Sequence, residues 1–123
     1  LYTVLYGEAN CKIKRIMEEK ILCSAIWYKE LELKKPEVLK PRNYRPNNCD
    51  RGIVFCGWRH PNCLYQMVAI TGKRQAEVGE YESGFLTNKN RFVDRKEGAK
   101  IALETNQIEK LQYGNQLYSE DLW

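Results

Sequence analysis

Histidine occurs only once in the 123 residues, at His60, so a mechanism that needs a histidine base has a single candidate. The motif spacings of α/β-hydrolases, P-loops, zinc metalloproteases and dinucleotide-binding turns do not occur. No apolar run approaches the length of a membrane span, and no signal-peptide pattern opens the chain. These absences argue against an enzyme and against a membrane partner, and they favour a cytoplasmic protein.

The charge balance and the cysteines exclude two further classes. Twenty basic and sixteen acidic side chains leave a net charge of +4, which suits a small anionic ligand but is too weak for a protein that coats a nucleic-acid polymer. The five cysteines are an odd number, and we interpret them as reduced thiols that fill the core. Four side chains could supply zinc ligands, but their spacings do not resemble the close pairs of structural zinc sites: Cys49, Cys56, His60 and Cys63. We therefore predict no metal and no cofactor.

Hydrophobic patterning predicts one α+β domain with a mostly antiparallel sheet and two principal helices packed on it. Residues rich in β-branched and aromatic side chains predict strands at 20–29, 51–58 and 81–87. Helical spacing predicts one helix from Pro61 through Val68 and a second from about Arg95 to about Thr105. We expect residues 17–123 to form this single ligand-binding domain and residues 1–16 to be an N-terminal extension or arm.

Local signals fix the ends of the two helices. Pro61 suits the first helical turn, where its missing N–H costs nothing. Asp94 is a good N-cap for the second helix, and Glu97 stands three positions later, as in a reciprocal capping box. Asn106 is suited to a left-handed stop.

The same arrangement occurs twice, because a strand leads through a basic turn into a helix start in both "CGWRHP" and "NKNRFVDR". Unpaired N–H groups at a helix start favour phosphate, and a neighbouring arginine offers it two-point contact. Aromatic and polar side chains nearby could hold a base and a ribose. The predicted ligand-binding residues are Trp58, Arg59, His60, Phe85, Leu86, Thr87, Asn90, Arg91, Phe92 and Arg95.

Ordinary structural roles remain open for the same residues. Arg91 and Arg95 flank Asp94 and could form solvated ion pairs. Phe85 and Phe92 are also typical core residues. From the pattern alone, a nucleotide site and a structural role are both open.

Four segments resemble the Thoeris anti-defence protein 1 family of phages: "ILCSAIWY", "GWRHPNCL", "GFLTNKNRFVDRKEGAKIALETNQI" and "LYSEDLW". The resemblance runs from about Lys20 to Trp123. It implies a non-catalytic sponge that binds a cyclic ADP-ribose isomer, such as glycocyclic ADP-ribose, made by a TIR-domain immune enzyme. The expected location is then the cytoplasm of the infected bacterium.

The resemblance also implies a homo-oligomer, a dimer or a hexamer, with ligand pockets between subunits, and in some members a second site for cyclic oligonucleotides. Two alternatives differ in class. One is an enzyme that cleaves or modifies a nucleotide, and the other is a phage protein that blocks a host protein by direct contact.

Overall fold

Four antiparallel strands form one sheet within the described part of the chain, in the order β2-β1-β3-β4. The computed structural model describes residues 18–40 and 44–123. The strands are β1 (Ile21–Tyr28), β2 (Ile53–Gly57), β3 (Tyr81–Thr87) and β4 (Phe92–Asp94). In the central strand, Ala25 pairs with Cys56 of β2 and with Gly84 of β3. The predicted arm at residues 1–16 lies outside the described residues.

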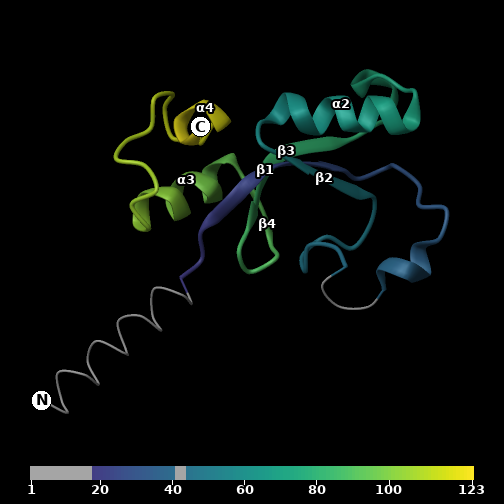
Figure 1. Cartoon of the computed structure of the whole chain (residues 1–123), viewed down its shortest axis with the longest axis horizontal. Coiled ribbons are helices and arrows are strands. Elements are labelled where there is room, and N and C mark those ends of the chain that lie inside the picture. The colour runs from purple at the N-terminus through teal and green to yellow at the C-terminus, as the bar shows by residue number, and fades with distance from the viewer. Residues whose placement is uncertain (1–17, 41–43) are drawn as a thin grey trace, which may run out of the picture.

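Both principal helices pack on the same face of this sheet (Figure 1). Helix α2 (His60–Thr71) lies against β1 and β2, and helix α3 (Arg95–Glu104) lies against β3 and β4. A short C-terminal helix, α4 (Ser119–Leu122), lies near the start of α2. Two single turns of 3-10 helix, η1 (Pro36–Leu39) and η2 (Gln75–Glu77), belong to the connections.

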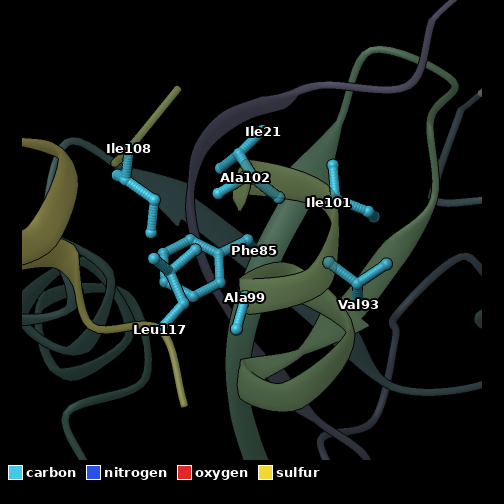
Figure 2. Close-up of a cluster of buried hydrophobic side chains, with 8 residues drawn as sticks. All are labelled: Ile21, Phe85, Val93, Ala99, Ile101, Ala102, Ile108 and Leu117. Carbon is cyan, nitrogen blue, oxygen red and sulfur yellow. The ribbon is translucent and has the colours of Figure 1, made fainter. Parts of the chain in front are cut away.

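The helix-bearing face contains two hydrophobic clusters. Phe85 is fully buried at the centre of the cluster under α3 (Figure 2), whose other members are Ile21, Val93, Ala99, Ile101, Ala102, Ile108 and Leu117. Gly98 allows this close packing, since a Cβ there would lie 3.0 Å from a ring carbon of Phe85. The cluster under α2 consists of Ile26, Tyr28, Phe55, Cys63, Met67 and Val78.

The opposite face of the sheet has a smaller cluster of its own, because successive side chains of a strand point to opposite faces. It consists of Ala25, Cys49 and Phe92, with Trp27, Val54, Cys56 and Leu86 packed around them. Cys49 comes from the connection before β2, so this loop partly covers a face that neither α2 nor α3 touches.

The predicted α+β class, the three long strands and both principal helices are confirmed. Strand β4 and helix α4 were not predicted. They contain three and four residues, too few for a periodic pattern to show.

The predicted capping box at α3 is only half present. The Asp94 carboxylate accepts a hydrogen bond from the Glu97 N–H at 2.8 Å, as expected of an N-cap. The Glu97 carboxylate does not return the contact, because it faces Arg91 at 3.2 Å instead. After the helix, Asn106 has a φ of 59°, which confirms the predicted left-handed stop.

Candidate functional site

The structure divides the ten predicted site residues among three places. Five gather where α2 begins: Trp58, Arg59, His60, Phe85 and Arg95. Two lie at the end of β3 and in the connection that follows it, Thr87 and Arg91. Three belong to the opposite face and its rim: Leu86, Asn90 and Phe92. Only the first group joins side chains from both predicted basic turns, so it is the candidate site.

Arg59 lies directly before the first residue of α2 and is held by two different contacts. Its guanidinium lies over the Trp58 indole, 4.7 Å from the ring centroid. Its Nη2 donates a hydrogen bond to the main-chain oxygen of Trp123. Its Nε is the one buried side-chain nitrogen or oxygen without a hydrogen-bond partner among residues 18–40 and 44–123. Such an orphaned donor favours any acceptor that can reach it.

Arg95 approaches from the start of α3 and also contacts the C-terminal segment. Its Nη1 donates to the main-chain oxygen of Leu117 at 2.9 Å, and its guanidinium lies 4.4 Å from the centroid of the Tyr118 ring. Burial lowers the pKa of Arg95, although an arginine stays charged at any ordinary pH. Beside it is a shallow pocket of about 320 Å³, lined by Ser83, Asp94, Arg95, Lys96 and Gln116.

His60 follows Arg59 in the chain, lies close enough to Arg95 to feel its charge, and is fixed as a neutral donor. Its Nε2 lies 2.8 Å from the main-chain oxygen of Gly84, so this nitrogen must carry the hydrogen. Its ring meets Phe85 edge-on, with centroids 5.2 Å apart. Burial lowers the pKa of His60 below its ordinary value, and the Arg95 charge lowers it further. The imidazole is therefore uncharged at neutral pH.

The two helix starts are electrostatically different. The positive end of α3 already faces the Asp94 carboxylate. Helix α2 has no side-chain acceptor from its N-cap residue, Arg59. The Asn62 side chain accepts from the Arg59 N–H at 2.9 Å and so fixes the turn before the helix. An added anion is therefore favoured at α2 more than at α3.

Arg91 does not join this group, because carboxylates already hold its guanidinium. It contacts both oxygens of Glu19, at 2.7 and 2.9 Å, and Glu97 at 3.2 Å. The Thr87 hydroxyl donates to the same Glu19 at 2.8 Å. The hydrogen bond from Arg91 lowers the pKa of Glu19, and the same bond raises the pKa of Arg91. The structure thus gives Arg91 and Thr87 an internal role.

The predicted stacking rings are core residues in this structure. Phe85 is completely buried, and Phe92 is 4% exposed and packs edge-on against Trp27 at 5.8 Å. Neither can lie flat on a base without leaving its hydrophobic cluster, so this conformation gives both rings a packing role. Trp58, at 60% exposed, is the ring of the predicted set that is open to a ligand.

Asn90 lies at the rim of the opposite face of the sheet, and Leu86 lies on its floor. Asn90 has a φ of 54°, and its side-chain amide donates to the main-chain oxygen of Arg45 at 2.9 Å. Leu86 packs into the cluster on that face.

The three cysteines weighed as zinc ligands are divided by the sheet. Cys63 belongs to the cluster under α2, whereas Cys49 and Cys56 lie on the opposite face. Within residues 18–40 and 44–123, the structure brings together no group of three or more side chains that could hold a metal ion.

Sequence reasoning missed the residues that complete the candidate site. Leu117, Tyr118 and Trp123 supply the two main-chain acceptors and a ring for the arginines. Their contacts with Arg59 and Arg95 depend on tertiary structure that no local pattern encodes.

A comparison with models of protein families matches residues 20–123 to the family described as phage T4 y16D protein. The chain belongs to this phage protein family. No curated protein and no solved structure gives a significant match to the chain. In the part of the chain that the structure describes, no helix is both long and apolar enough to cross a membrane.

Proposed function

We propose that this phage protein is a non-catalytic anti-defence protein that sequesters a cyclic ADP-ribose isomer, glycocyclic ADP-ribose, and so blocks Thoeris signalling. The observation that carries the proposal is the convergence of Arg59 and Arg95 on the C-terminal segment at the start of α2. Both guanidinium groups donate to main-chain oxygens there. A pyrophosphate is a stronger acceptor than the neutral carbonyl of Leu117, because its charge assists each hydrogen bond.

The ligand's parts match the open groups of the site. One phosphate accepts from Arg59 and the other accepts from Arg95. The adenine stacks on Trp58, the exposed indole beside them. His60 remains a neutral positioning residue that fixes the turn through Gly84.

A second copy of the chain completes the enclosure in this proposal. The pocket beside Arg95 measures about 320 Å³ and is shallow, at the low end of the roughly 300–1,000 Å³ typical of small-molecule sites. A sponge must surround its ligand to hold it tightly, and a symmetric partner adds the missing wall without a longer chain.

The chemistry around His60 supports binding without turnover. The Nε2 of His60 contacts the main-chain oxygen of Gly84 rather than a hydroxyl, a thiol or a carboxylate. The Cys63 thiol lies near main-chain oxygens of Ser24 and Arg59. A nucleophile needs a base within hydrogen-bond reach, and His60 is the only histidine in the chain.

The decisive experiment mixes the purified protein with glycocyclic ADP-ribose, heats the mixture to denature the protein, and identifies the released compound by mass spectrometry. We expect to recover the original messenger unchanged, with the bound amount limited by the number of protein binding sites. A converted product that grows with excess messenger supports the nucleotide-modifying alternative. No binding by calorimetry and no thermal shift would reject the sponge and favour direct contact with a host protein.

A further inference from the structure

A second hollow lies on the opposite face of the sheet, away from α2 and α3. Its volume is about 230 Å³. Its floor is apolar, because Val54 and Cys56 of β2 and Leu86 of β3 point to this face. The connection before β2 forms the wall, with Tyr44 and Pro46 among the lining residues.

Hydrogen bonds to the β3–β4 turn hold this wall in place. The Asn47 N–H donates to the Asn90 main-chain oxygen at 2.7 Å, and the Asn90 amide donates to the Arg45 oxygen at 2.9 Å. The Asn48 side chain pairs with β4 like an added strand residue: it accepts from the Phe92 N–H at 2.8 Å and donates to the Phe92 oxygen at 2.6 Å. The hollow is therefore preformed rather than made by a loose loop.

Two arginines of the lining carry charge that the described residues do not neutralise. Arg45 and Arg51 have neither a salt bridge nor a side-chain hydrogen bond to any residue within 18–40 and 44–123. The other four arginines described there, Arg59, Arg74, Arg91 and Arg95, each donate to an oxygen. Two arginines whose guanidinium groups have no partner among the described residues are therefore among the lining residues of this hollow.

We propose that this hollow is a binding site for a compact apolar molecule that carries one anionic group, a phosphate monoester or a carboxylate. Arg45 and Arg51 hold the anionic group by charge-assisted hydrogen bonds, and the apolar body lies on Val54, Cys56 and Leu86. Asn90 is a positioning residue that fixes Arg45 through its main-chain oxygen.

The volume selects the size of the ligand. At roughly 30 Å³ for each water in the liquid, the hollow corresponds to the space of about eight waters and stays below the usual pocket for drug-sized molecules. It admits one ring with its head group and not a cyclic dinucleotide. The site is thus separate from the proposed messenger site in both place and ligand class.

The test titrates the full-length, ¹⁵N-labelled protein with phenyl phosphate and follows backbone amides by NMR. Inorganic phosphate tests the anion alone, benzyl alcohol tests the apolar body alone, and benzoate distinguishes the two head groups. We expect saturable shifts at Cys56, Leu86 and Asn90, with tighter binding of phenyl phosphate or benzoate than of either partial probe. Equal affinity for inorganic phosphate, or shifts centred on His60, would overturn the proposal.

Matched variants decide whether the two arginines are responsible. Arg45→Gln and Arg51→Gln remove no hydrogen bond of the described fold, and each should weaken phenyl phosphate binding roughly tenfold. Arg74→Gln removes the same charge from a side chain that is 85% exposed and does not line the hollow, so it should change binding little. If all three variants weaken binding equally, the effect is general charge and the site does not exist. Retained amide dispersion in each spectrum confirms that the variant is folded.

Discussion

Arg91 and Glu19, seventy-two positions apart, form a two-point ion pair with N–O distances of 2.7 and 2.9 Å. This pair ties the residues before β1 to the turn before β4. The sequence predicted Arg91 as a phosphate ligand, but in the structure its guanidinium donors already bind the carboxylates of Glu19 and Glu97.

Replacing Arg91 should therefore reduce stability and spare messenger binding. We expect Arg91→Ala to lower the free energy of unfolding by about 1 kcal/mol, a modest value because the Arg91 side chain is 38% exposed and solvent screens the pair. Chemical denaturation measures the change. Arg74→Ala, which removes an exposed ion pair with Glu77, is the control and should have a smaller effect. A larger loss of messenger affinity than of stability would indicate that Arg91 contacts the messenger.

The same pair should give the protein an acid-sensitive component of stability. Arg91 lowers the pKa of Glu19 below 4.5, so the unfolded state takes up the proton first as the pH falls. The stabilisation is complete above that ordinary value and is lost as the pH falls through the lower folded value. Denaturation curves between pH 6 and pH 3 should show this loss in the natural chain, and Arg91→Ala should show less of it. Parallel curves for both proteins would contradict the pairing.

The part of the fold that follows from local chemistry was predictable, and the part that depends on distant contacts was not. The strand at 81–87 and the cap at Asp94 follow from signals within a few residues, and both predictions are confirmed. The partners of Arg91 and Arg59 lie 72 and 64 positions away, at Glu19 and Trp123. No spacing rule connects such residues, because only the packed sheet and helices bring them together.

The candidate site shows the same division. Two basic turns before two helices predicted Arg59 and Arg95 together, and the structure places both against the C-terminal segment. The pattern left open whether Phe85 packs in the core or contacts a ligand, and only the packed structure shows that it is fully buried. An amphipathic strand carries aromatic residues for packing and for binding alike, so residue type alone does not separate these roles.

Arg59 and Arg95 should each be needed for messenger binding. Arg59→Gln and Arg95→Gln should weaken glycocyclic ADP-ribose roughly tenfold or more, because each removes charge-assisted hydrogen bonds to phosphate. Calorimetry measures the affinity, with Arg74→Gln as the control for net charge. Unchanged affinity in both variants would place the messenger elsewhere, while loss of binding only in proteins that also unfold would make the arginines structural.

His60 should titrate below the ordinary histidine value of 6.5, because burial disfavours its charged form. It is the chain's only histidine, so its imidazole NMR signals need no further assignment. Since the folded pKa is lowered, the unfolded state binds the proton more readily, and stability should fall as the pH drops through 6.5. His60→Gln should lack this step. A midpoint at or above 6.5 would show that the ring is more exposed than its contact with Gly84 implies.

Cys23 should be the most reactive thiol among the cysteines that the structure describes. A hydrogen bond from the neighbouring Cys56 thiol, helped by the Gly57 main chain, lowers the pKa of Cys23 below its ordinary value despite partial burial. Burial raises the pKa of Cys49 and of Cys63 to about 11, so these stay protonated at neutral pH. Brief alkylation with iodoacetamide at pH 7.5, followed by peptide mass spectrometry, should label Cys23 first. Cys56→Ala removes the donor and should shift the onset of Cys23 labelling to higher pH, whereas Cys63→Ala, which leaves that donor in place, should not. Equal labelling of Cys23 and the buried Cys49 in the folded protein would contradict this arrangement of thiols.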